Sequence, residues 1–256
     1  MDLGLDGTRV LVTGSSRGIG YAIASGFLSE GARVALVAKE VQALETATNR
    51  LRSQYGDDAV VMYPMDCLDS RQWSETIETI KLDWGGLDVV ISNIGNGTGS
   101  DCAVPDNAEF LESWRTNLQT AIETSRATIN LLQPKGGSIL FISSIAGLEA
   151  IGAPTGYSVA KSGLFALAKQ MSKRLAPLIR VNCISPGNIF FEGGVWERNT
   201  SRNPREVELM IKEKVPLRRF GTPDEIADAA VFLSSTRASF ITGENLVVDG
   251  GQTVRF

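Results

Sequence analysis

The chain has 256 residues, 43% of them hydrophobic and 21% charged, and its formal net charge is −4. This composition supports a sizeable core, and the lack of a long basic run argues against nucleic acid or an anionic membrane surface as a partner. The chain contains no histidine. That absence excludes a Ser-His-Asp hydrolase, a histidine proton shuttle and most zinc or non-haem iron sites, so we expect no metal.

The three cysteines are odd in number, widely spaced and in no C-x-x-C pair: Cys67, Cys102 and Cys183. This pattern is typical of reduced, mostly buried thiols in a cytoplasmic protein. The opening residues include early acidic side chains and no apolar run of signal-peptide length, and no segment approaches the roughly 20 apolar residues that span a bilayer. We therefore expect a cytoplasmic protein without a membrane partner.

Short runs of β-branched and aliphatic residues alternate with longer amphipathic stretches. The runs predict seven strands, at 9–13, 34–38, 59–63, 88–92, 138–143, 179–185 and 245–249. The longer stretches predict helices near 19–30, 40–55, 70–83, 106–132, 157–176 and 224–235. Most of the strands are apolar on both faces, as parallel strands covered by helices on each side are. The alternation predicts an α/β fold: a doubly wound (Rossmann) seven-stranded parallel sheet with helices on both faces.

No linker, repeat or low-complexity tract divides the chain, so we expect a single domain over 1–256. The stretch 188–222 interrupts the alternation, because it is long, polar and rich in glycine and aromatic residues. An excursion of that length in a compact domain is usually a functional lid or a disordered insertion. We interpret it as a substrate lid.

A glycine-rich loop, TGSSRGIG at 13–20, follows the first strand and opens the first helix. Gly14, Gly18 and Gly20 allow a tight turn, close approach of the backbone to a pyrophosphate, and packing of the helix on the sheet. Ser16, Arg17 and Ile19 complete the loop. The helix N-terminus adds N–H donors and a positive dipole end for phosphates. In this strand–loop–helix context the glycines predict a dinucleotide site.

The end of the second strand bears on which dinucleotide is bound. An acidic residue there favours the ribose hydroxyls of NAD, and a basic residue favours the 2′-phosphate of NADP. Here Ala38 is followed by Lys39, and Arg17 adds a second cation. We therefore favour NADP(H) over NAD(H). Against this stand the neighbouring Glu40 and the alternative that both cations are solvated surface charges.

Tyr157 and Lys161 lie four positions apart, on one face of the predicted helix 157–176. The ordinary pKa of a phenol is near ~10, and a nearby ammonium group lowers it. Such a pair can exchange protons near neutrality in a chain that has no histidine. Spacing alone also fits an ordinary helix with one aromatic and one charged residue.

Six motifs in order along the chain bear on whether Tyr157 and Lys161 are functional. TGSSRGIG is followed by SNIG (92–95), ISSIAG (142–147), YSVAK (157–161), SPGN (185–188) and ITGENLVVDGG (241–251). In this set the chain resembles the short-chain dehydrogenase/reductase family, in its compact single-domain branch, over essentially its whole length.

The resemblance implies roles for individual residues. Tyr157 is then the proton donor in carbonyl reduction, Lys161 lowers its pKa and holds the nicotinamide ribose, and Ser144 polarises the substrate carbonyl. Asn117 holds a water that connects Lys161 to solvent, and Asp66 contacts the adenine. The alternatives are a strand-end cap for Ser144 and Asp66 and a surface position for Asn117. The remaining cofactor-binding residues implied by the resemblance are Cys67, Asn93, Gly95, Pro186, Gly187 and Ile189.

Two positions depart from the family pattern. The N-N-A-G that usually follows the fourth strand is here Ser92-Asn93-Ile94-Gly95. The threonine expected four residues after Gly187 is here Phe191. The second change implies either a different loop path or a nicotinamide contact made by backbone alone.

The function that we expect is an NADP(H)-dependent oxidoreductase acting on a small carbonyl or secondary alcohol. The alternatives are an NAD(H)-dependent sugar or polyol dehydrogenase, an isomerase or dehydratase with a transient hydride step, and a non-catalytic NADP-binding protein. Substrate choice is expected to lie in 95–106, in 147–156 with Glu149, and in the lid with Phe190, Glu192 and Trp196. The resemblance also implies a homotetramer or homodimer.

Overall fold

The computed structural model describes residues 2–132 and 137–255. These residues contain seven strands in one all-parallel sheet of order β3-β2-β1-β4-β5-β6-β7. The strands are β1 (Arg9–Thr13), β2 (Arg33–Ala38), β3 (Val60–Pro64), β4 (Val89–Ser92), β5 (Gly137–Ile142), β6 (Ile179–Pro186) and β7 (Asn245–Val248). The predicted doubly wound sheet is confirmed. The chain runs outward from β1 to β3 and then returns to β4, so the order of strands switches between β1 and β4. Ligands bind at such switch points in open α/β sheets.

The apolar runs become strands that are buried on both faces. Every residue of β5 is buried, as are the last five residues of β2. This is the environment of parallel strands between two helical layers. β7 differs, because all four of its residues are only partly buried at the edge of the sheet.

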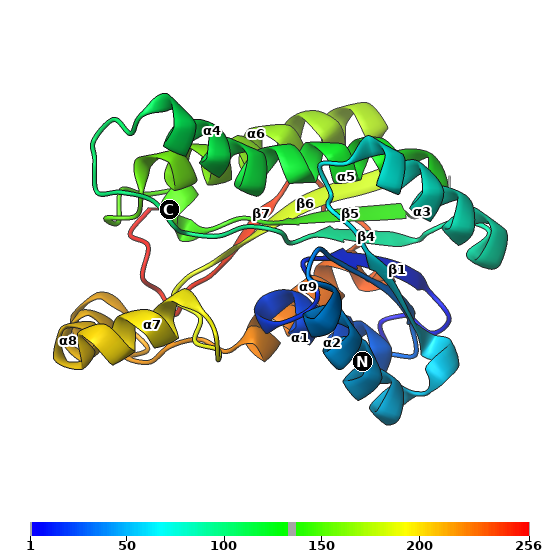
Figure 1. Ribbon diagram of the computed structural model, residues 1–256, viewed down its shortest axis with the longest axis horizontal. Helices are drawn as coiled ribbons and strands as arrows, with labels where there is room; N and C mark the ends of the chain where they lie inside the picture. Colours follow the sequence, from blue (N-terminus) through cyan, green and yellow to red (C-terminus); the bar gives the residue numbers. More distant parts are fainter. Residues whose placement is uncertain (1, 133–136, 256) are drawn as a thin grey trace.

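The helices form two layers (Figure 1). On one side, α1 (Gly18–Ser29), α2 (Val41–Tyr55) and α9 (Pro223–Ser234) share a core with the sheet through residues such as Phe27, Leu44 and Ile226. On the other, α3 (Ser70–Trp84), α5 (Thr120–Thr128) and α6 (Thr155–Leu175) do so through Trp73, Ala121 and Leu164. None of the helices in the described ranges is both long and apolar enough to cross a bilayer.

The prediction of a single helix over 106–132 is wrong in detail. The chain forms α4 (Asn107–Trp114), a π-helical turn η2 (Arg115–Gln119), α5, and a 3₁₀ turn η3 (Ile129–Leu131). The amide nitrogen of the Asn117 side chain donates to the carbonyl oxygen of Ser113, four residues earlier. That carbonyl is the acceptor that α-helical geometry assigns to the backbone amide of residue 117, so the side chain competes with the regular ladder.

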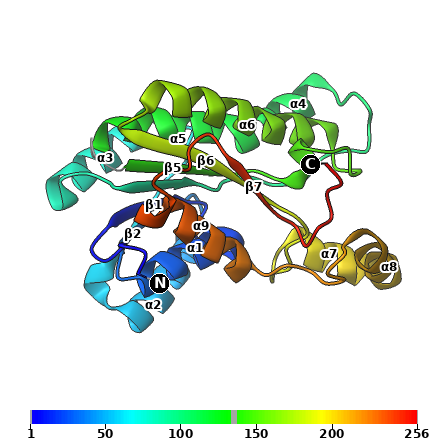
Figure 2. The same ribbon diagram turned by 180° about the vertical axis from the view of Figure 1, so that it is seen from behind.

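The stretch 188–222 is ordered and contains two helices that the sequence pattern did not predict. These are α7 (Val195–Arg202) and α8 (Pro204–Lys214), and they stand apart from the layers beyond one end of the sheet (Figure 2). Two backbone hydrogen bonds tie the ends of the stretch together. Phe190 N donates to the oxygen of Gly221 at 3.0 Å, and Gly221 N donates to the oxygen of Asn188 at 2.9 Å. The two helices therefore project from a closed base.

Candidate active site

Most predicted cofactor-binding residues, and Ser144, lie in loops that leave the carboxyl ends of strands, whereas Asn117 lies in η2 and Tyr157 and Lys161 lie in α6. The glycine loop follows β1, residues 93–97 follow β4, Ser143 and Ser144 follow β5, and residues 187–191 follow β6. Because the strands are parallel and adjacent, these loops gather at one edge of the sheet, at the switch point. The fold therefore brings the two groups of predicted residues, catalytic and cofactor-binding, to a single edge.

Ser144, Tyr157 and Lys161 come together at the end of β5. Ser144 begins the short turn η4 (Ile145–Gly147), where its hydroxyl accepts a hydrogen bond from Ala146 N at 3.1 Å. Tyr157 lies in the first turn of α6, and Lys161 Nζ lies 5.9 Å from the centre of its ring. The hydroxyl of Ser143 donates to the Lys161 carbonyl at 2.8 Å, which fixes α6 against the end of β5.

Burial shifts the pKa values of both members of this pair. Burial raises the pKa of the Tyr157 phenol, and a hydrogen bond from Ser144 opposes that rise only in part. Burial also lowers the pKa of Lys161 to about 8. The Lys161 ammonium donates to the carbonyl of Ile142 at 2.9 Å. That Lys161 lowers the pKa of Tyr157, as the resemblance implies, stays a prediction.

Asn117 and Lys161 meet at Gly95. A β-carbon added to Gly95 would lie 2.7 Å from both Asn117 Oδ1 and Lys161 Nζ, so only glycine fits between them. Asn117 is fully buried, and its Oδ1 accepts from Asn96 N at 2.9 Å. The departure at Ile94 is absorbed by packing, since this side chain lies partly buried against the core beneath α3, α5 and α6.

The glycine loop has the geometry that a pyrophosphate requires. Gly14 and Gly18 have φ of +66° and +56°, and a β-carbon on Gly20 would lie 2.3 Å from the carbonyl oxygen of Gly14. The Asn93 side chain donates to that same carbonyl at 3.1 Å. No side chain caps α1 and its first turn holds no acidic residue, so its N–H groups are available to an anion. The residues present therefore fit a dinucleotide.

The tip of β2 carries one of the two predicted cations. Lys39 Nζ donates to Asp66 Oδ2 at 3.0 Å, and Asp66 Oδ1 accepts from Leu68 N at 2.9 Å. The backbone hydrogen bond and the ion pair hold the pKa of the Asp66 carboxyl below its usual value. Ala38 and Cys67 beside them are buried. The second predicted cation, Arg17, is not at the tip of β2. Its guanidinium lies near Gly193, in the stretch 188–222.

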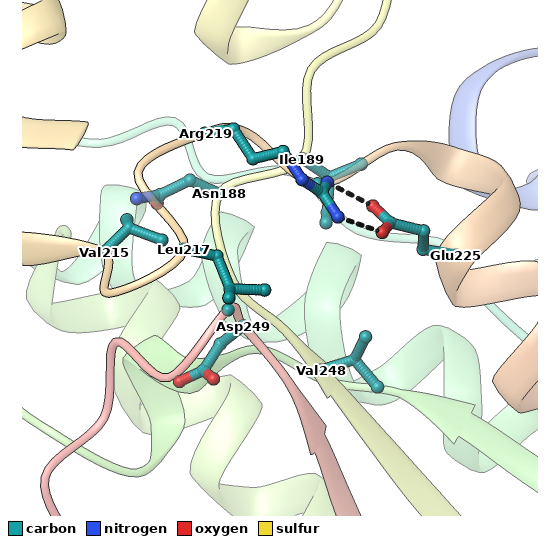
Figure 3. Close-up of a pocket in the computed structure, with 10 residues that line it drawn as sticks. Asn188, Ile189, Val215, Leu217, Arg219, Glu225, Val248 and Asp249 are labelled. Carbon is teal, nitrogen blue, oxygen red and sulfur yellow. Dashed lines mark hydrogen bonds and ion pairs between the residues drawn. The ribbon is translucent and has the colours of Figure 1, made fainter. Parts of the chain in front are cut away.

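The loop after Pro186 is pressed against the end of β7. Gly187 N donates to the Val248 carbonyl at 2.9 Å, and a β-carbon on Gly187 would lie 2.7 Å from the Asp249 α-carbon. Behind this loop lies a cavity of about 110 Å³ (Figure 3). Its lining includes Ile189 and the ion pair of Arg219 with Glu225, but none of the four candidate catalytic residues. The cavity is therefore separate from the catalytic group.

Two contacts at this edge of the sheet could not be predicted from the sequence pattern. The ring of Phe191, the departure noted above, lies against Gly18 of the glycine loop. Glu149, named above among the residues expected to bear on substrate choice, accepts hydrogen bonds through Oε1 from the backbone N–H groups of Val254 and Arg255. Neither pairing follows from local periodicity, because the partners are far apart in the chain.

Comparison with known proteins agrees with this geometry. Residues 14–253 match the sequence profile of the family described as enoyl-(acyl carrier protein) reductase. A short-chain dehydrogenase/reductase of Arabidopsis thaliana is 33% identical over 254 residues, which cover 98% of this chain and 96% of that protein. The chain is a member of the short-chain dehydrogenase/reductase family. As a member of this family it is an oxidoreductase.

Two further relatives represent different branches of the family. The 3-oxoacyl-(acyl carrier protein) reductase of Chlamydia muridarum is 35% identical over 243 residues, covering 94% of this chain and 95% of that protein. The crystal structure of L-sorbose reductase from Gluconobacter frateurii, complexed with NADPH and L-sorbose, superposes with a TM-score of 0.92 at 30% identity. Coverage there is 100% of both chains.

Proposed function

We propose that the protein is an NADP(H)-dependent carbonyl reductase or secondary-alcohol dehydrogenase. The observation that carries the proposal is the convergence of Ser144, Tyr157 and Lys161 beside the glycine loop. Tyr157 and Lys161 together offer the proton-transfer chemistry that a chain without histidine otherwise lacks. A protein that merely sensed or stored a dinucleotide would need the loop but not this trio.

Each residue has a defined task in the proposed reaction. When bound, the nicotinamide supplies or accepts the hydride. In reduction, the Tyr157 hydroxyl gives its proton to the oxygen of the former carbonyl, and its raised pKa keeps that proton in place beforehand. The Ser144 hydroxyl hydrogen-bonds to the same oxygen and stabilises the charge that develops there. In alcohol oxidation the proton moves in the opposite direction.

Lys161 and Asn117 support the tyrosine. We propose that Lys161 Nζ, which donates to the Ile142 carbonyl, would hold the ribose of the nicotinamide nucleoside when the cofactor binds. Its pKa of about 8 means that this group can itself exchange a proton near neutrality. Asn117, beside it at Gly95, is suited to hold the water through which Lys161 reaches solvent.

The cofactor contacts follow from the loops. Gly14, Ser16, Arg17, Gly18, Ile19 and Gly20 hold the pyrophosphate; Asn93, Gly95, Asp66 and Cys67 hold the adenosine half; and Pro186, Gly187 and Ile189 hold the nicotinamide amide. Lys39 at the tip of β2 is the residue that we propose for a 2′-phosphate, and its ion pair with Asp66 keeps its ammonium group at this end of the strand. The NADPH complex of L-sorbose reductase supports the choice of NADP(H).

The substrate is proposed to enter between three walls. The first two, 95–106 and 147–156, are joined by Thr155, whose hydroxyl donates to the carbonyls of Cys102 and Ala103 at 3.3 and 3.2 Å. The third is the lid 188–222. In it the rings of Phe190 and Trp196 each lie 5.5 Å from that of Phe220. This aromatic cluster makes an apolar face suited to a ring or chain carrying one reducible carbonyl.

The proposal is tested by following consumption of NADPH and NADH side by side with an acetoacetyl thioester, L-sorbose, a cyclic ketone and a diketone. Turnover that is faster with NADPH supports both the reaction and the cofactor. Turnover that is faster with NADH favours the alternative of an NAD(H)-dependent sugar or polyol dehydrogenase, particularly if L-sorbose is the substrate. Tight NADPH binding with no turnover of any substrate contradicts the assignment to this substrate class.

A further inference from the structure

The last described residues, 249–255, run between two walls of the proposed substrate site. At their start they pack on the end of the lid. Leu217 N donates to the Gly250 carbonyl at 3.1 Å, and a β-carbon on Gly251 would lie 3.1 Å from Pro216. At their far end Glu149 Oε1 accepts from Val254 N at 2.9 Å and from Arg255 N at 3.0 Å.

Side chains from two further places fix the middle of this segment. Asp249 accepts from Gly251 N at 2.9 Å through one carboxylate oxygen and from Thr253 N at 2.7 Å through the other. The Asn188 amide donates to the side-chain oxygen of Gln252 at 2.8 Å. Gly250 and Gly251 both have positive φ, which permits the reversal after β7. The path is therefore built, rather than being a loose end of the chain.

The two hydrogen bonds that Glu149 accepts from Val254 and Arg255, called the clasp below, relate this segment to the proposed function. Glu149 lies five residues after Ser144, in the loop that leaves η4. Asn188 lies in the loop proposed to hold the nicotinamide, and residues 215–217 form the end of the lid. Figure 1 shows the segment leaving β7, turning beside α7 and rising to the C-terminal mark on the side of α4 and α6. One segment thus bridges the lid and the serine loop.

We propose that residues 249–255 form a strap beside the proposed substrate site, and that Glu149 is the positioning residue that clasps it. A carboxylate that accepts two backbone N–H groups makes charge-assisted hydrogen bonds, which are stronger than neutral ones. Within residues 2–132 and 137–255, no hydrogen bond joins the strap to Ser144, Tyr157 or Lys161, so it should contribute binding that is equal for bound substrate and transition state. Such binding alters KM and leaves kcat unchanged. The inference rests on the proposed function.

The test compares Glu149→Ala with Glu149→Gln, which keeps an acceptor oxygen without the charge. Hydrogen–deuterium exchange of the C-terminal peptide reports the clasp directly, because the two N–H groups at 254 and 255 lose their acceptor in Glu149→Ala. We expect faster exchange there, a KM for the carbonyl substrate raised about tenfold, kcat within twofold of wild type and unchanged NADPH affinity. Glu149→Gln should be intermediate. Glu45→Ala, on the exposed face of α2, is the control.

A chain ending at Thr253 removes both donors and serves as the second variant if Glu149→Ala does not fold. Unchanged exchange in Glu149→Ala would show that the clasp does not exist and would overturn the proposal. Faster exchange with an unchanged KM would also overturn it, since the strap would then be no part of the substrate site. A wild-type enzyme inert toward every carbonyl would contradict the proposed function instead, and the exchange measurement would still decide the clasp.

Discussion

The ring of Phe191 lies directly against Gly18, joining the stretch 188–222 to the glycine loop. A β-carbon added to Gly18 would lie 2.6 Å from Cε2 of the ring, and one added to Gly194 would lie 3.1 Å from Cζ. The ring is thus held between the two glycines. The family pattern has a small polar threonine at this position, whereas here an aromatic ring lies against Gly18.

This contact predicts a coupling between Gly18 and Phe191 that can be measured by a double-mutant cycle. Gly18→Ala should destabilise the wild type through both its positive φ and the clash with the ring, whereas in Phe191→Ala only the backbone strain remains. We expect a coupling of about 1 kcal/mol or more in the free energy of unfolding by urea. Gly7→Ala is the matched control, since Gly7 has φ of +70° but no neighbour within 4 Å of an added β-carbon. Additive values for Gly18 and Phe191 would refute the contact.

Tyr157→Phe should remove turnover and leave cofactor binding nearly intact. The substitution deletes only the hydroxyl that donates the proton, and general acid–base catalysis by one side chain contributes typically about 10²- to 10⁴-fold. Steady-state kcat and fluorescence titration with NADPH separate the two effects. Tyr55→Phe, whose hydroxyl lies 3.0 Å from that of Ser25 in the opposite helical layer, should keep full activity. If Tyr157→Phe retains more than about a tenth of the activity, another group donates the proton.

Lys161 should make stability depend on pH. Its pKa is 10.5 in the unfolded chain and about 8 in the folded one, so between these values the unfolded state binds more protons. The free energy of unfolding of the wild type, relative to that of Lys161→Met, should therefore rise with pH between these two values. The full change is about 3 kcal/mol at about 1.4 kcal/mol per pKa unit.

Urea unfolding at pH 7.5 and pH 10 measures this difference, and the penalty for keeping the charged lysine buried should be largest at the lower pH. Lys173→Met, at an exposed position of the same helix, corrects for the general loss of a lysine. A wild-type-minus-variant difference that stays flat with pH would mean that burial does not perturb Lys161.

Lys39→Ala should lower the preference for NADPH over NADH at least about tenfold, because a charge-assisted hydrogen bond is worth roughly 1.5–3 kcal/mol. The ratio of the two dissociation constants is the readout, since contacts to the adenine and pyrophosphate are common to both cofactors. The exposed Lys81→Ala, on α3, should leave the ratio unchanged. If the ratio of the NADPH and NADH dissociation constants is unchanged in Lys39→Ala, Lys39 does not contact the cofactor, and its pairing with Asp66 is an ordinary surface ion pair.

The strands were predictable for a physical reason, and the catalytic group only in part. A parallel strand buried on both faces must be a short apolar run, and each run found in the sequence lies within one residue of a strand in the structure. Ser144, Tyr157 and Lys161 all follow β5, with the last two on one face of α6. The helical spacing indicated that Tyr157 and Lys161 share a face, but Ser144 was identified only through the family resemblance.

The features that were missed depend on contacts without local periodicity. α7 has no buried residue and α8 has only two, Val207 and Ile211, so neither shows a clear apolar stripe. The clasp at Glu149 joins a carboxylate to backbone N–H groups 105 residues away, and any sequence supplies such donors. Spacing also shows that Lys161 is near Tyr157, but not that its ammonium donates to the Ile142 carbonyl.

The π turn at Arg115–Gln119 has a consequence for how the family can vary in length here. Each residue of an α-helix advances the chain by about 100°, so deleting one residue from this turn would leave a smooth helix with its two halves rotated against each other. Either Asn117 would turn away from Gly95, or the buried face of α5 would turn away from the sheet. We therefore expect changes of length to be tolerated better in α7 and α8, which hold few buried residues, than at this turn, where the number of residues sets the rotation of α4 against α5.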